Sequence, residues 1–71
     1  MNYIKINGEA FELPTHPDKV NSVLNHIDMC KKDLKQFVRL SPLSGGESKK
    51  ISAEVLKISS IYVFIDDKLC G

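Results

Sequence analysis

The dipeptide Asn7-Gly8 constrains the fold of this chain more than any other feature, because it predicts a tight two-residue turn. Residues 3–6 and 9–13, on either side of it, alternate between apolar and polar side chains. Both turn residues tolerate the positive φ angles that such hairpin turns require. We therefore expect an opening β-hairpin, with Pro14 ending its second strand. One face of the hairpin should be buried, formed by Ile4, Ile6, Phe11 and Leu13.

A helix is predicted over about residues 16–30. Thr15 stands three residues before Asp18, the spacing of a reciprocal cap at a helix start. Lys31 and Lys32 follow the helix and complement the negative end of its dipole. Apolar residues recur at i, i+3, i+4 and i+7 and predict one stripe packed on the hairpin: Val20, Val23, Leu24 and Ile27.

The second half of the chain predicts two further strands and one ambiguous segment. Residues 36–40 read as a short strand that Pro42 ends. Residues 41–50 are rich in Gly, Ser and Lys, which predicts a loop, and residues 51–56 fit either a short helix or an edge strand. Residues 61–65 are β-branched and aromatic without a charge, which predicts a central final strand.

The resulting order, ββαβ(β)β over 71 residues, matches the β-grasp architecture. This is an α+β fold in which a mixed four- to five-stranded sheet packs on one helix and the last strand pairs with the first. We expect one domain over residues 1–65 and a flexible tail over 66–71, because the start of the tail has no apolar side chains to offset the entropy of ordering. The predicted core comprises Ile4, Ile6, Phe11, Leu13, Val20, Val23, Leu24, Ile27, Val38, Leu40, Leu56, Ile61, Val63 and Ile65.

Composition argues against several function classes. Ten basic and nine acidic side chains give a net charge of +1, too little to draw the chain to nucleic acid or to a membrane surface. Two cysteines are too few for a disulfide framework, and no leader or bilayer-length apolar run is present, which favours the cytoplasm. The sequence holds no serine, histidine and acid constellation and offers little room for a substrate cleft. We expect no enzyme activity and no cofactor.

Three segments carry a family resemblance. Residues 4–14 resemble the opening hairpin of the thiamine-pathway sulfur carriers, and residues 56–57 with 61–63 resemble the turn and last strand that lead into their tail. The helix has the apolar spacing of theirs, in Val20, Val23, Leu24, Ile27 and Met29. The chain is thus similar to these carriers and to their molybdopterin-synthase small-subunit relatives, which share the ubiquitin-like β-grasp fold. That family ends in Gly-Gly, whereas this chain ends in Cys70-Gly71.

The resemblance implies a sulfur carrier or ubiquitin-like modifier that is activated at Gly71. Its ionised carboxylate would attack the α-phosphorus of ATP on an adenylating partner enzyme of the ubiquitin-activating type. The acyl-adenylate would then accept sulfur as a thiocarboxylate, or an amine as a conjugate. Cys70 would either impede threading of the tail or supply a thiol step. The implied partners are the adenylating enzyme and a sulfur donor or acceptor enzyme, as in thiamine biosynthesis.

A different class of function is compatible with the same fold, because one fold hosts many functions. The chain would then be a small β-grasp interaction or inhibitor module that binds through its sheet and uses no tail chemistry. Alternation along residues 61–65 turns Tyr62 and Phe64 away from the helix if their neighbours face it. With Leu69 from the tail, these aromatic residues form the predicted partner-binding set.

Two further clusters have weaker support. His26 and Cys30 lie one helical turn apart, with His16 and Cys70 as conceivable further ligands, but the spacing lacks the paired motifs of zinc sites, so no metal is predicted. A group of basic residues could form a face for an acidic protein groove or RNA, whereas the interspersed acidic residues favour a solvated surface. The group comprises Lys31, Lys32, Lys35, Arg39, Lys49 and Lys50.

Overall fold

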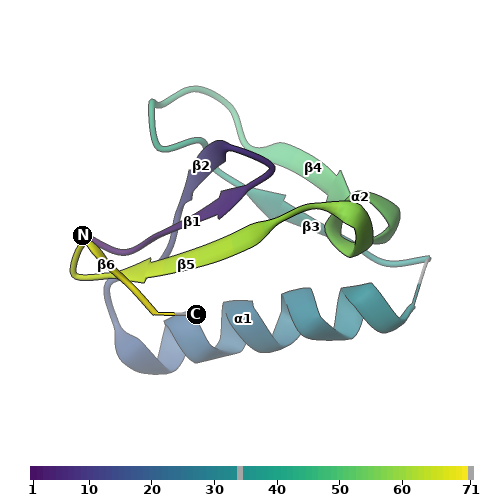
Figure 1. Ribbon diagram of the computed structural model, residues 1–71, viewed down its shortest axis with the longest axis horizontal. Helices are drawn as coiled ribbons and strands as arrows, with labels where there is room; N and C mark the ends of the chain where they lie inside the picture. Colours follow the sequence, from purple (N-terminus) through teal and green to yellow (C-terminus); the bar gives the residue numbers. More distant parts are fainter. Residues whose placement is uncertain (34, 71) are drawn as a thin grey trace.

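Eight elements follow one another along the chain in the computed structural model, which describes residues 1–33 and 35–70. Five of them match elements that the sequence predicts: the two hairpin strands, the long helix, the short strand before Pro42 and the final core strand. Figure 1 shows their arrangement. The elements are β1 (Tyr3–Ile6), β2 (Glu9–Glu12), α1 (Pro17–Lys32), β3 (Phe37–Leu40), β4 (Lys49–Ser52), α2 (Ala53–Ile58), β5 (Ile61–Ile65) and β6 (Lys68–Leu69).

The opening hairpin is confirmed. β1 and β2 pair antiparallel, with Ile4 opposite Phe11. The turn residues Asn7 and Gly8 have φ angles of 53° and 85°, in the left-handed region that hairpin turns of this length require. The turn therefore fixes the register that buries the apolar face of both strands.

The strands form one four-stranded sheet, in the order β2-β1-β5-β6, and a separate β3–β4 hairpin. β5 pairs with β1, as expected of the first and last core strands, but the pairing is antiparallel, with Ile4 opposite Val63. The sheet has four strands, within the predicted range. The predicted mixed pairing is wrong, because all pairings among the described strands are antiparallel, and β3 pairs with β4 in a separate hairpin. The direction of β5 follows from its entry point: Asn7 N–H donates to the Ser60 carbonyl at 2.9 Å, so β5 starts beside the first turn and runs back along β1.

The ambiguous segment 51–56 contains both alternatives in succession. β4 ends at Ser52, and α2 begins at the next residue. The Ser52 hydroxyl caps α2 by accepting a hydrogen bond from the Val55 N–H at 3.3 Å. The predicted loop over residues 41–50 is consequently too long, since Lys49 and Lys50 belong to β4.

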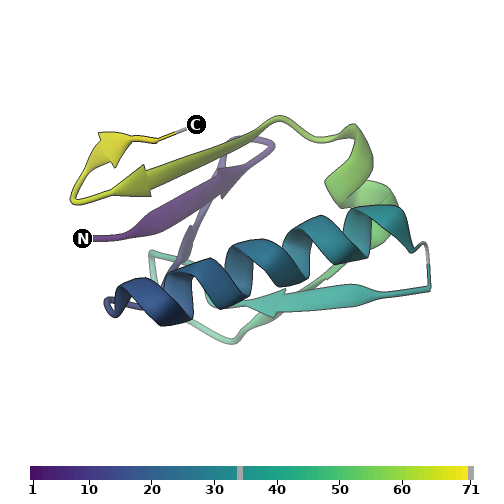
Figure 2. The same ribbon diagram turned by 90° about the horizontal axis from the view of Figure 1, so that it is seen from below.

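The predicted helix is confirmed as α1, and its cap is corrected. His16, not Thr15, is the cap residue, because Pro17 occupies the first helical position and the His16 ring accepts from the Asp18 N–H at 3.3 Å. Lys31 and Lys32 lie in the last turn, as expected. Seen from below, α1 lies over the strands, with β5 and β6 on one side of it and β3 on the other (Figure 2).

The core lies between α1, α2 and the inner faces of the strands. All fourteen predicted core residues are either buried or packed against the buried cluster. Val23, Leu24, Ile61, Val63 and Ile65 are the partly buried members. The prediction missed Cys30, Ile51 and Ala53, which are fully in the core. The predicted central strand, β5, lies between β1 and β6 in the sheet and is only partly buried.

Candidate functional site

The outer face of the four-stranded sheet brings together the residues predicted to bind a partner. Ile4 and Val63 lie opposite each other and point into the core, so the alternate residues of β1 and β5 face outward. The surface they form, with Leu69 of β6, is called the outer sheet face below. It comprises Tyr3, Lys5, Tyr62, Phe64 and Leu69.

Phe64 is the centre of the outer sheet face. It lies directly opposite Tyr3 on one side and directly opposite Leu69 on the other. The Tyr3 and Phe64 rings are stacked, with 4.6 Å between centroids and 9° between planes. The Lys5 ammonium lies 5.7 Å from the centroid of the Phe64 ring. An aromatic and aliphatic row therefore crosses three neighbouring strands.

Tyr62 extends this row along β5. It lies opposite Lys5 in the register and is 48% exposed, while Leu69 is 58% exposed. The sequence predicted that Tyr62, Phe64 and Leu69 act together, and the strand pairings place them on one face. It missed Tyr3 and Lys5, because nothing local to residues 3–6 reveals which residues of β5 lie opposite them.

The segment after β5 differs from the predicted free arm. Asp66 and Asp67 adopt positive φ angles of 52° and 66° and reverse the chain. Lys68 then pairs with Ile65, and the Cys70 N–H donates to the Val63 carbonyl at 2.7 Å. Two successive positive φ angles are those of a type I′ hairpin turn, so residues 66–70 fold back along β5.

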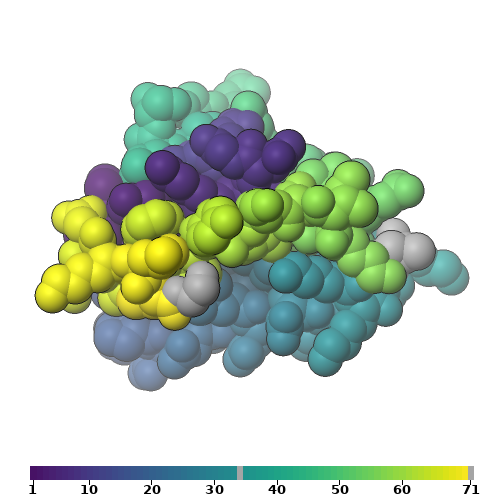
Figure 3. All heavy atoms as spheres, viewed as in Figure 1, coloured from purple at the N-terminus to yellow at the C-terminus, as the bar shows by residue number. Residues whose placement is uncertain are grey.

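In the space-filling view, the yellow atoms of this C-terminal hairpin lie at the surface between the purple first strands and the blue α1 (Figure 3). Cys70 is exposed, and its thiol donates to the Lys68 carbonyl at 3.3 Å. The other residue predicted to be activated, Gly71, lies outside the described residues.

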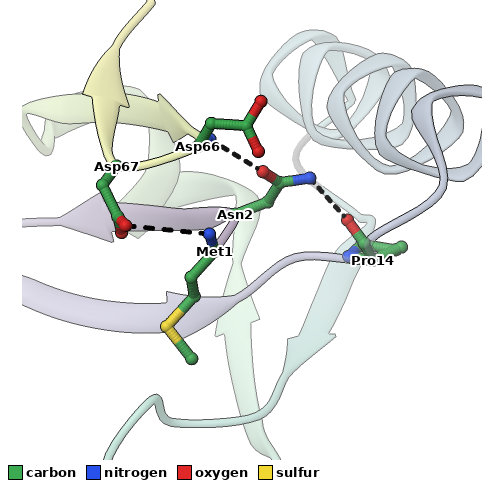
Figure 4. A network of polar contacts seen from close by, with 5 residues as sticks. All are labelled: Met1, Asn2, Pro14, Asp66 and Asp67. Carbon is green, nitrogen blue, oxygen red and sulfur yellow. Dashed lines mark hydrogen bonds and ion pairs between the residues drawn. The ribbon is translucent and has the colours of Figure 1, made fainter.

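A polar network holds the turn of the C-terminal hairpin against the start of the chain (Figure 4). The Asn2 side chain accepts from the Asp66 N–H at 3.0 Å and donates to the Pro14 carbonyl at 3.1 Å. The Asp67 N–H donates to the Met1 carbonyl at 3.1 Å. Asn2 is a buried polar residue whose side-chain oxygen and nitrogen are both satisfied, so it ties three segments together.

A cavity of about 410 Å³ opens on the opposite side of β5 from the outer sheet face, between β5 and the first turns of α1. Its apolar wall is formed by Val20, Leu24, Val63 and Ile65, and Cys70 also lines it. The cavity accounts for the partial exposure of Leu24, which the sequence predicted to be core. This cavity was not predicted from the sequence, because residues of α1 and β5 meet there only in the folded chain.

The predicted helical pair His26 and Cys30 is present, with 3.7 Å between the histidine Nε2 and the thiol Sγ. Cys30 is fully buried, and burial, with a smaller contribution from the Asp33 carboxylate, raises the pKa of its thiol. Within residues 1–33 and 35–70, no three or more His, Cys, Asp and Glu side chains gather closely enough to hold a metal ion. His16 and Cys70 are thus not brought to this pair.

Comparisons with protein-family models, with curated proteins and with solved structures found no match to this chain. Neither helix in the described part of the chain has the length and apolar character needed to cross a membrane.

Proposed function

We propose that this chain is a small protein-interaction module that binds a partner protein through the outer sheet face. The observation that carries the proposal is the row of Tyr3, Phe64 and Leu69 across three strands, with Tyr62 exposed beside it. Aromatic residues are enriched in the cores of protein interfaces. The role is one of binding and not of catalysis, and the cytoplasmic location belongs to the same proposal.

Preorganisation supports this role. The Tyr3 ring is already stacked on Phe64, and both rings stand on paired strands. A partner would therefore immobilise few additional side chains, which lowers the entropic cost of association. Lys5 beside the rings adds a charge that would orient an acidic or carbonyl group of the partner at the rim.

Site-specific photocrosslinking tests the proposal. A photoreactive phenylalanine analogue at position 62 should crosslink to one dominant protein in the source cells, whereas the same analogue at Asn25, exposed on α1, should not. With that protein purified, Tyr62→Ser and Leu69→Ser should each weaken binding at least about tenfold, the loss typical of an interface hot spot. Equal crosslinking from both positions, or unchanged affinity of both variants, would overturn the proposal.

The sulfur-carrier or modifier role remains a second proposal. It is supported by the resemblance of the hairpin and helix segments and by the exposure of Cys70 at the end of the two-residue strand β6. Extension of residues 66–70 into the channel of an adenylating enzyme would break the hydrogen bond between the Cys70 N–H and the Val63 carbonyl. The β-grasp fold expected from the sequence has a mixed sheet, whereas β1 and β5 pair antiparallel. The carrier role therefore requires this pairing to be compatible with that fold.

Mass spectrometry separates the two proposals. The chain is incubated with ATP and an adenylating enzyme of a thiamine or molybdopterin pathway, and the intact mass is measured after addition of a sulfur donor. A mass increase for the thiocarboxylate that disappears on deletion of Gly71 would support the carrier role. An unchanged mass, together with a Tyr62-dependent complex, would support the interaction module.

A further inference from the structure

The β3–β4 hairpin carries a second exposed surface, on strands that do not contribute to the outer sheet face. Val38, Leu40 and Ile51 point into the core, so the alternate residues point away from it. Three of these outward residues, Phe37, Arg39 and Lys50, are called the basic hairpin face below. Phe37 is 41% exposed, and Arg39 and Lys50 are both exposed.

The two cations of the basic hairpin face converge on one ring. The Lys50 ammonium lies 4.4 Å from the centroid of the Phe37 ring, and the Arg39 guanidinium carbon lies 5.9 Å from it. Arg39 and Lys50 are also directly opposite each other in the register of the hairpin. Each cation is therefore attracted to the same ring, and the two like charges stand on directly opposite residues.

This arrangement opposes the usual rule for sheets, because like charges directly opposite one another are destabilising. The neighbouring Lys49, by contrast, is paired with Glu9. In the described part of the chain, the ion pairs involve Met1, His16 and Lys49, and none involves Arg39 or Lys50. Arg39 and Lys50 thus stand opposite each other without an ion pair to any carboxylate in the described part of the chain, and such local conflicts are expected at functional sites.

We propose that the basic hairpin face binds an acidic peptide segment of a partner protein. A glutamate or aspartate of that segment would bridge Arg39 and Lys50, while the Phe37 ring keeps both cations in place. Charge complementarity identifies the occupant, since a carboxylate would relieve the repulsion that the hairpin retains. This inference goes beyond the proposed function, because it concerns other strands and another partner chemistry.

An acidic peptide fits this surface better than a nucleic acid. Binding to nucleic acid rests on many phosphate contacts and a marked basic excess, whereas the net charge of this chain is +1. A base would also have to stack on Phe37, whose ring already lies beneath the Lys50 ammonium. A carboxylate needs only the two cations and leaves the ring contacts in place.

Amide chemical-shift mapping of the ¹⁵N-labelled chain tests the proposal, with a hexaglutamate peptide as the probe at low and at physiological salt. Shifts should concentrate at residues 37–39 and 49–52 and weaken as salt is added. The double variant Arg39→Gln/Lys50→Gln should bind the peptide at least tenfold more weakly. The control Lys19→Gln/Lys32→Gln removes the same charge from α1 and should bind within about twofold of the unmodified chain.

Loss of the exposed, unpaired cations should not unfold the chain, and retained dispersion of the amide spectrum checks this. Phe37→Leu, which keeps both cations, should weaken binding less than the double variant. Three results would overturn the proposal: no localised shifts at low salt, an equal loss in the α1 control, or tighter binding of a hexathymidylate oligonucleotide through the same residues. The last of these would assign the face to nucleic acid.

Discussion

The side-chain oxygen of Asn2 accepts a hydrogen bond from the backbone N–H of Asp66, 64 positions later in the sequence, at 3.0 Å. Through its amide nitrogen the same side chain holds the Pro14 carbonyl, so the start of the chain, the entry to α1 and the C-terminal hairpin share one buried residue. This contact lies at the turn that leads into β6, which carries Leu69 of the outer sheet face.

Replacing Asn2 by alanine should therefore lower the free energy of unfolding by about 1–3 kcal/mol, because the Asp66 N–H and the Pro14 carbonyl lose their partner in a partly buried setting. Urea denaturation measures the change. Asn25→Ala, at an exposed position of α1, is the matched control and should change stability by less than about 0.5 kcal/mol. Equal effects of the two substitutions would show that the network does not stabilise the fold.

The double substitution Asp66→Asn/Asp67→Gly in the turn should raise the free energy of unfolding. Both residues have positive φ angles, which Asn-Gly adopts more readily than Asp-Asp. We expect a gain of about 0.5–1 kcal/mol, a fraction of the roughly 1–2 kcal/mol per residue that left-handed backbone costs ordinary residues. The exposed ion pair between Asp67 and the Met1 amine contributes little to offset the gain.

Asp67→Ala serves as the control for this turn. It removes the Asp67 carboxylate, as the double substitution also does, without supplying a residue that favours positive φ, so it should destabilise the chain. Thermal unfolding by circular dichroism ranks the three chains, and a double variant less stable than the original would contradict the assigned turn.

Truncation to alanine should lower the free energy of unfolding more at Leu56 than at Leu24. Leu56 is 0% exposed, whereas Leu24 is partly buried and lines the cavity beside β5. Leu56→Ala should cost about 2–5 kcal/mol, as expected of a fully buried leucine. Leu24→Ala should cost less, because part of its surface already faces solvent. Chemical denaturation of both variants checks the order, which would be reversed if α2 did not pack into the core.

The two cysteines should differ in reactivity towards iodoacetamide at mildly alkaline pH. Cys70 is exposed, whereas Cys30 is fully buried and its pKa is raised by burial and, to a smaller extent, by Asp33. Only the thiolate reacts, so Cys70 should be alkylated first and Cys30 only through opening of the fold. Peptide mass spectrometry over time measures both rates, and equal rates in the native chain would contradict the burial of Cys30.

Cys30 should also make stability depend on pH. Its pKa is higher in the folded than in the unfolded chain, so the folded state holds the thiol proton more tightly. The contribution is fully present below the ordinary thiol pKa and is lost as pH rises through the raised value. Urea midpoints should therefore fall over that alkaline range, and less steeply for Cys30→Ala. Parallel slopes for the two chains would rule this contribution out.

The sequence alone determined the parts of the fold that depend on neighbouring residues. Asn7-Gly8 predicted the first turn because positive φ is a local property of those residues, and the spacing of Val20, Val23, Leu24 and Ile27 predicted α1 because a helix has a fixed period. Alternation along β5 likewise predicted that Tyr62 and Phe64 share the face opposite the core.

The tertiary structure decided the direction of β5, the C-terminal hairpin and the composition of the candidate surfaces. β5 runs antiparallel to β1 because α2 delivers the chain beside the Asn7 turn, and no residue of β5 encodes that direction by itself. The Asp66-Asp67 turn is held by hydrogen bonds to Asn2 and Met1, at the other end of the chain. Tyr3 meets Phe64, and Arg39 meets Lys50, through strand register, which depends on contacts between distant segments and not on local propensity.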